Sequence, residues 1–110
     1  MTDNMTLNDY QTQAETTAVY PEVIALPYLI LGLAGEAGEL ANKYKKVLRG
    51  DKAIDDVREA LIDEAGDCMW YIAMIASELG VDLSEVAARN VRKLAARLEN
   101  NTIKGDGDVR

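Results

Sequence analysis

The sequence contains no histidine and a single cysteine, and both scarcities exclude classes of active site. Without histidine the chain cannot build a Ser-His-Asp or Cys-His nucleophile, a His-ligated zinc site, or the Glu-x-x-His motif of di-iron bundles. Cys68 has no second cysteine to pair with, and its apolar neighbours favour a role as a small core residue in a reducing compartment. Any metal ion held by these residues must therefore have oxygen ligands.

Basic residues are also scarce relative to acidic ones, with 12 Lys+Arg against 19 Asp+Glu and a formal net charge of −7. This balance opposes binding to nucleic acid or to an anionic membrane surface. The longest uncharged stretches, 23–35 and 68–77, are shorter than the ~20 residues that span a bilayer, and no signal peptide is evident. We expect a cytoplasmic protein with no nucleic-acid or membrane partner.

Apolar residues recur at helical spacing, and no segment alternates with a period of two for long enough to be a strand. The sequence therefore predicts an all-α fold in one domain over 1–110. The expected helices cover 4–19, 27–48, 55–79 and 82–98, followed by a Gly/Asp-rich tail over 100–110. The expected N-caps are Thr6 or Asn8, then Asp55 or Asp56, then Asp82 or Ser84, and the expected helix stops are Gly50 and Gly80.

The second and third expected helices are joined by a short turn at 50–52, which predicts an antiparallel hairpin. The segment 65–79 is apolar nearly all round, so it requires cover on more than one side. Four short helices do not supply that much cover. We expect a four-helix-bundle-like subunit that assembles into a homo-oligomer partly through the third helix.

Each helix of the expected hairpin carries two carboxylates three residues apart, a spacing that places both on one helix face. Glu36 and Glu39 belong to one helix, and Glu64 and Asp67 belong to the other. Glu36 pairs in register with Asp67, and Glu39 with Glu64, because each pair is centred on the same turn. The four carboxylates are therefore expected to converge.

Four like charges between apolar segments repel one another and resist desolvation unless cations neutralise them. Oxygen-only ligation favours Mg²⁺ or Mn²⁺. The neighbouring small residues, such as Gly35, Gly38 and Gly66, leave room for ions, water and a ligand. The alternative is an ordinary solvated face paired with lysines, which a lone Glu-x-x-Glu would favour. Two mirrored pairs favour the metal site.

Candidate phosphate contacts lie on two helices. Lys43 and Lys46 extend the acidic face of the second helix, while Asn90, Lys93 and Arg97 share one face of the fourth. Solvated faces with intrahelical ion pairs explain these spacings equally well. Tyr71 follows Asp67 by one turn and lies in register with Gly32, as in a base-stacking pocket, although core packing is the commoner role of such a residue.

This pattern resembles the MazG-like family of nucleoside triphosphate pyrophosphohydrolases. The resemblance rests on Glu-x-x-Glu followed after 24 residues by Glu-x-x-Asp, and on further motifs along most of the chain. These motifs are Leu-Gly-Leu-Ala-Gly-Glu-Ala-Gly-Glu at 31–39 with Asn42 and Lys43, Asp-Glu-Ala-Gly-Asp at 63–67 with Trp70 and Tyr71, Asn90 to Lys93 with Arg97, and the 105–110 tail. One departure is Gly35, where many members carry a second glutamate.

The resemblance implies a helical-bundle subunit, assembly into dimers or tetramers, and Mg²⁺-dependent cleavage of a nucleoside triphosphate to monophosphate and pyrophosphate. It implies metal ligation by Glu36, Glu39, Glu64 and Asp67, and triphosphate or base contacts by Lys43 or Lys46, Asn90, Lys93, Arg97 and Tyr71, with Trp70 nearby. Glu36 and Glu39 are alternatives for the general base. The sequence does not identify the nucleotide substrate, and the candidates include an alarmone such as ppGpp.

Two further hypotheses come from other classes of function. The chain is a helical module that binds nucleotide and metal, or mediates assembly, without turnover. Alternatively it stores metal or performs redox chemistry at a carboxylate bundle, which the missing histidines disfavour.

Overall fold

The computed structural model describes residues 4–100, and this part of the chain is entirely helical. Its elements are α1 (Leu7–Glu15), a 3₁₀ turn η1 (Glu22–Ile24), α2 (Ala25–Leu48), α3 (Ile54–Glu78) and α4 (Leu83–Glu99). The all-α prediction is confirmed over these residues. The predicted tail lies outside the described residues, apart from Asn100.

Three helix boundaries, the start of α1 and the ends of α2 and α3, follow from local chemistry that the sequence shows directly. The Asp9 amide donates to Thr6 Oγ1 (3.0 Å) and the Thr6 amide to Asp9 Oδ2 (3.1 Å), so α1 begins with a capping box at Thr6 rather than at Asn8. The helices α2 and α3 end before Gly50 and Gly80, as predicted. Both glycines have positive φ, 86° and 75°, which a side chain would disfavour.

The predicted N-cap of α3, Asp55 or Asp56, is wrong, whereas the predicted N-cap of α4 is confirmed at Asp82. The N-cap of α3 is Ala53, and Asp56 acts from inside the first turn by accepting the Ala53 amide (3.0 Å). The N-cap of α4 is Asp82, but its side chain makes no capping hydrogen bond. The first amides of α4 donate instead to side chains of α1, described below.

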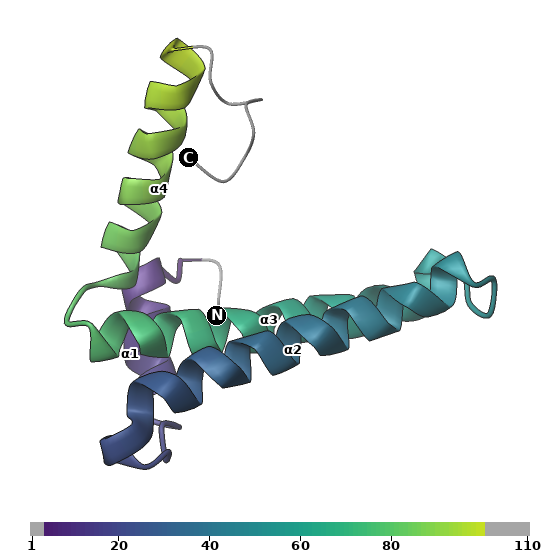
Figure 1. Cartoon of the computed structure of the whole chain (residues 1–110), viewed down its shortest axis with the longest axis horizontal. Coiled ribbons are helices and arrows are strands. Elements are labelled where there is room, and N and C mark those ends of the chain that lie inside the picture. Colours follow the sequence, from purple (N-terminus) through teal and green to yellow (C-terminus); the bar gives the residue numbers. More distant parts are fainter. Residues whose placement is uncertain (1–3, 101–110) are drawn as a thin grey trace.

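The helices α2 and α3 lie side by side as a long antiparallel hairpin whose turn is remote from the rest of the molecule (Figure 1). At the opposite end α1 packs against α3, and α4 leaves this end and points away from the hairpin. Among the described residues α4 contacts α1 and α3 but not α2. The predicted antiparallel hairpin is present, but the single chain does not close into a four-helix bundle, because α4 is held only at its base.

The hydrophobic core lies at the end of the hairpin where α1, α2, α3 and the first turn of α4 meet. Leu29 and Met74 are completely buried there, together with Ala14, Ala73 and Leu83. The radius of gyration is 16.6 Å, whereas a compact domain of this length has a value of roughly 13 Å. The single chain is therefore extended, with a core at one end.

Large apolar side chains remain exposed on the helices that extend from this core. Leu31 on α2 is 72% exposed, and Val91 and Leu98 on α4 are 64% and 67% exposed. The segment Glu22–Leu48 is also long and apolar enough to cross a membrane by length and composition alone, in contrast to the prediction from uncharged stretches. This criterion is weak, because core helices of soluble proteins satisfy it too. Only 11% of its most apolar window is buried within the single chain.

Candidate metal centre

Three carboxylates meet between α2 and α3, near the middle of the hairpin. One oxygen from each of Glu36, Glu64 and Asp67 lies within 4.8 Å of the others. Glu36 comes from α2, whereas Glu64 and Asp67 come from successive turns of α3 and therefore share a face. Two helices in antiparallel register thus bring together groups that lie far apart in sequence.

The carboxylates of Glu36 and Glu64 lie close together between α2 and α3. Hydrogen bonding to Glu64 is the main reason that the pKa of Glu36 is raised above its ordinary value, and desolvation and the charges of Asp67, Glu64 and Glu39 raise it further. The cluster therefore disfavours the ionised form of Glu36, and a bound cation would offset this effect.

Glu64 provides an independent test of whether a cation fits. Its Oε1 is buried and has no hydrogen-bond partner among the described residues, while its Oε2 lies 3.3 Å from Lys43 Nζ. The Glu64 side chain is only 13% exposed, so solvent does little to stabilise the free oxygen. A buried, unpartnered carboxylate oxygen beside two other carboxylates is a chemically suitable ligand set for Mg²⁺ or Mn²⁺. The residues present therefore fit a divalent cation.

Glu39 does not join the three-carboxylate group, although the register argument placed it there. It is exposed and lines a shallow hollow of about 280 Å³ on the side of α2 that leads toward the turn. The residues of this basic hollow are Glu39, Asn42, Lys43, Lys45, Lys46 and Arg49. Register fixes the height of a residue along the hairpin but not its direction around the helix, and an offset of three residues rotates Glu39 by about 60° from Glu36.

Lys43 links the carboxylates to the basic hollow. Its ammonium group pairs with Glu64 at 3.3 Å, and it lines the hollow with Lys46, three residues further along α2. Of the two predicted phosphate-binding lysines of α2, Lys43 contacts the acidic group and Lys46 lines the basic hollow beyond it. The alternative of a solvated face paired with lysines describes the Lys43–Glu64 contact but leaves Glu64 Oε1 unexplained.

The glycines around the carboxylates leave open space in the single chain. A Cβ atom built at Gly35, Gly38 or Gly66 would meet no atom within 4 Å. This is consistent with the expectation that small residues keep room beside the acidic group. Gly32 is different, because a Cβ atom there would overlap the ring of Tyr71.

Tyr71 places its ring against α2 at Gly32 and contacts Trp70 edge-on, with ring centroids 5.0 Å apart. Both rings pack against the hydrophobic core. Burial is the main reason that the pKa of Tyr71 is raised, with further contributions from Tyr28, Glu36 and Asp67. The ring is thus part of the core beside the carboxylates, where the predicted register with Gly32 placed it.

The predicted phosphate contacts of α4 lie apart from the carboxylates in the single chain. Asn90 and Lys93 line a second hollow of about 710 Å³, at the elbow between α3 and α4, together with Leu79, Val81, Val86 and Arg89. Arg97 lies in the last turn of α4. Because α4 makes no contact with α2, one chain does not bring these groups to Glu36, Glu64 and Asp67.

Sequence reasoning missed three residues of α1 that bear on the site. Burial, and to a smaller extent the negative charge of Asp67, raise the pKa of Tyr10, which places this phenol near the acidic group. Asn8 and Gln11 contact the start of α4. Gln11 was detectable, because it interrupts the apolar stripe of Leu7, Tyr10 and Ala14.

Comparison with known proteins identifies the family. The sequence model of the MazG nucleotide pyrophosphohydrolase domain matches residues 26–102, which include α2 from its second residue, all of α3 and all four predicted ligands. The Gene 37 protein of Mycobacterium phage L5 is 43% identical over 114 residues, in an alignment that covers 96% of this chain and 100% of the relative. No solved structure matches the chain. With its paired carboxylates at the heart of the matched region, the chain belongs to the MazG nucleotide pyrophosphohydrolase domain family.

Proposed function

We propose that this protein is a Mg²⁺-dependent nucleotide pyrophosphohydrolase that cleaves a (deoxy)nucleoside triphosphate to the monophosphate and pyrophosphate. The observation that carries the proposal is the group of Glu36, Glu64 and Asp67 oxygens within 4.8 Å, one of which is buried without a partner. We further propose that Mn²⁺ can replace Mg²⁺ and that the protein acts in the cytoplasm without a nucleic-acid or membrane partner.

Glu36, Glu64 and Asp67 would hold the cation, which when bound neutralises charge on the phosphoryl oxygens. Lys43 and Lys46 bind the phosphate chain where it extends into the basic hollow. Lys43 also pairs with Glu64 Oε2 at 3.3 Å, so the same lysine contacts a proposed metal ligand and lines the hollow where the phosphates are expected. Tyr71 positions Glu36 and Asp67 by filling the space between α2 and α3 at Gly32.

Glu39 is our choice for the general base that removes a proton from the attacking water. It lies outside the Glu36–Glu64 hydrogen bond, is accessible to solvent and faces the hollow where the phosphates are expected. A base must reach the proton that it abstracts, and a side chain already committed to a cation is less available for that step. The structure thus favours Glu39 over Glu36, between which the sequence did not discriminate.

We also propose that the active form is a homo-oligomer, a dimer or tetramer. The exposed Leu31, Val91 and Leu98, and the extended shape of the chain, leave apolar surface that a second copy would cover. Assembly also supplies a route by which Asn90, Lys93 and Arg97 of one copy approach the carboxylates of another. Within one chain α4 does not reach α2.

The experiment that tests the function is a screen for pyrophosphate release from ribo- and deoxyribonucleoside triphosphates, including noncanonical ones, with ppGpp as an additional compound. The variant Asp67→Asn removes one carboxylate of the acidic group, and Glu59→Gln is the matched control. Glu59 lies on the same helix, and its exposed ion pair with Arg58 has no part in the site. We expect Mg²⁺-dependent turnover that Asp67→Asn abolishes and Glu59→Gln leaves intact.

Two results would refute the proposal. One is the absence of turnover above the Asp67→Asn background for every compound. The other is equal activity of Asp67→Asn and the parent chain. Thermal stabilisation by nucleotide and Mg²⁺ without any product would instead support the alternative, a module that binds both without turnover.

A further inference from the structure

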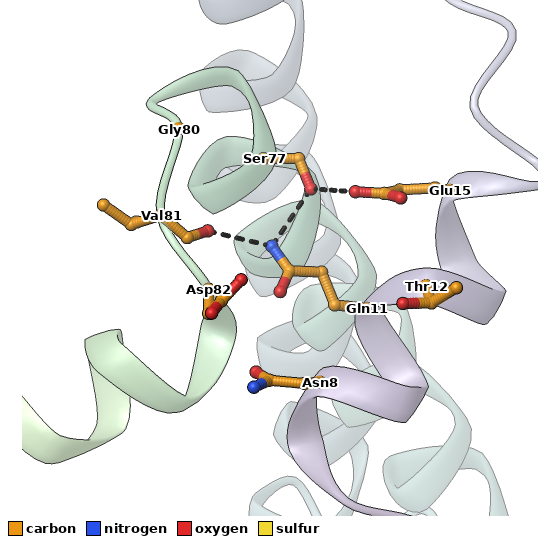
Figure 2. Close-up of a pocket in the computed structure, with 8 residues that line it drawn as sticks. All are labelled: Asn8, Gln11, Thr12, Glu15, Ser77, Gly80, Val81 and Asp82. Carbon is orange, nitrogen blue, oxygen red and sulfur yellow. Dashed lines mark hydrogen bonds between the residues drawn. The ribbon is translucent and has the colours of Figure 1, made fainter.

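The N-terminus of α4 is capped by another helix rather than by its own residues. The first amides of any helix lack intrahelical partners, and a side chain at the N-cap usually satisfies one of them. The N-cap Asp82 makes no such bond. Instead the Leu83 amide donates to Gln11 Oε1 (2.7 Å) and the Ser84 amide to Asn8 Oδ1 (3.0 Å). Both acceptors belong to α1, which lies directly against the start of α4 (Figure 2).

Gln11 also ties this junction to α3. Its side-chain nitrogen donates to Ser77 Oγ (3.0 Å) near the end of α3 and to the Val81 carbonyl (3.1 Å) in the connection to α4, as Figure 2 shows. Ser77 in turn donates to Glu15 Oε2 (2.6 Å). Gln11 is only 6% exposed, so water cannot replace these partners at low cost. One amide group therefore joins α1, α3, the Gly80 turn and α4.

Within one chain, the rest of α4 has few other contacts that fix its direction. Leu83 at its base is buried, but Val91 and Leu98 further along are exposed, and α4 makes no contact with α2. Lys93 lies ten residues beyond Leu83, about 15 Å along the helix axis. A tilt of roughly 20° at the base would move Lys93 by ~5 Å, more than the length of a hydrogen bond. Small changes at the cap are thus amplified along α4.

We propose that Asn8 and Gln11 are positioning residues that set the direction of α4 within its own chain and so place Asn90 and Lys93 for contact with a triphosphate in the assembled protein. The consequence for substrate rests on the proposed function, whereas the effect on α4 is independent of it. Losing the Asn8 acceptor should have a smaller effect on the junction than losing the Gln11 acceptor. Asn8 bonds one amide at an exposed position, while Gln11 is the buried centre of the junction.

Asn8 provides the cleaner test. Asn8→Ala removes the acceptor of the Ser84 amide, whereas Asn8→Asp retains an oxygen there and adds a charge that the helix N-terminus favours. Asn8 and Gln11 line a hollow of about 290 Å³ at the junction (Figure 2). Thr12→Ala is the control, because Thr12 lines this hollow without a hydrogen bond to α4 among the described residues. Gln11→Ala is the second, more severe variant. Circular dichroism confirms that each variant retains its helices.

The direct measurement is the distance between spin labels on cysteines introduced at Lys52 and Glu99, in a Cys68→Ala background diluted with unlabelled protein. Both positions are exposed and lie at the far ends of the hairpin and of α4. We expect one narrow distance distribution for the parent, Asn8→Asp and Thr12→Ala, and a broadened or shifted one for Asn8→Ala. Parent-like distributions for both Asn8→Ala and Gln11→Ala would overturn the proposal.

The kinetic measurement uses the unlabelled chain, with Cys68 intact, and the best triphosphate from the substrate screen. Asn8→Ala should raise KM by roughly 3- to 10-fold with kcat within about twofold, and Asn8→Asp should restore the parent value. Reduced kcat with unchanged KM would contradict a role in holding substrate contacts. If the parent hydrolyses no triphosphate, the proposed function fails, while the distance distributions still decide whether Asn8 and Gln11 orient α4.

Discussion

Replacing Gly32 by alanine should destabilise the chain, although the same change in most helices is stabilising. Gly32 lies inside α2, where glycine costs about 1 kcal/mol relative to alanine. The new Cβ would overlap the ring of Tyr71, which is packed between Trp70 and the core. Relieving such an overlap by moving a packed ring costs about 1–3 kcal/mol. The expected net change is a loss of roughly 0–2 kcal/mol in the free energy of unfolding.

The reasoning is tested more sharply by repeating the substitution without the ring. In a Tyr71→Leu background the overlap is removed, so Gly32→Ala should stabilise by about 1 kcal/mol, and the two changes should be coupled by about 1–3 kcal/mol. Gly66→Ala is the control, because a Cβ atom there meets open space and only the gain in helix propensity remains.

Urea denaturation at fixed protein concentration, in metal-free buffer, measures all of these changes without interference from assembly or ligand. If Gly32→Ala stabilised the parent chain as much as Gly66→Ala does, Tyr71 would not be packed against α2 as described. An equal effect of Gly32→Ala with and without the Tyr71 ring would refute the coupling. Either result would also remove the basis for Tyr71 as the group that spaces α2 from α3 beside the carboxylates.

Three further predictions concern pH and assembly. Because contact with Glu64 raises the pKa of Glu36, this group stabilises the metal-free chain below about pH 4.5, and that contribution is lost as pH rises. Mg²⁺ should therefore raise the melting temperature more at about pH 8 than at about pH 5. A gain that does not depend on pH would contradict the raised pKa of Glu36. Burial and the Glu78 hydrogen bond raise the pKa of Tyr20 to about 12, so the contribution of Tyr20 to stability is complete below pH ~10 and falls between pH ~10 and ~12. In urea melts at neutral pH, Tyr20→Phe should lower the free energy of unfolding by about 0.5–1 kcal/mol. On going to alkaline pH, the variant should lose less of its free energy of unfolding than the parent does. Leu98→Glu should lower the molar mass measured by light scattering without reducing the helix content, whereas an unchanged mass would exclude the exposed face of α4 from the interface.

The helix boundaries were predictable because short-range chemistry determines them. Gly50 and Gly80 end α2 and α3 with positive φ, and Thr6 caps α1 through a residue three positions away. The capping of α4 was not predictable in the same way. Its acceptors, Asn8 and Gln11, lie more than 70 residues earlier in the chain, so only the tertiary structure reveals that they reach Leu83 and Ser84.

The candidate site was predictable in register but not in rotation. An antiparallel hairpin with a short turn places Glu36 opposite the Glu64–Asp67 turn, and these three groups do meet. Glu39 lies close enough for its charge to raise the pKa of Glu36, but its carboxylate is outside the three-carboxylate group and lines the basic hollow, so its role as a ligand stays a prediction. Hydrophobic periodicity likewise located α4 without showing that it leaves the hairpin, because its apolar face is equally compatible with its own chain or with another copy.

The single chain departs from a closed bundle at α2 and at α4, and both departures affect how much solvent reaches the carboxylates. An exposed apolar surface on α2 and an α4 that does not contact α2 both leave the neighbourhood of the carboxylates open to solvent. In such a setting hydrogen bonding to Glu64 raises the pKa of Glu36, and water screens the charge of the exposed Asp67. Covering α2 with a second copy would remove that screening and increase the cost of the clustered charges unless a cation entered. Self-association and metal binding are therefore expected to support each other, because the helix that carries Glu36 also carries the uncovered apolar surface.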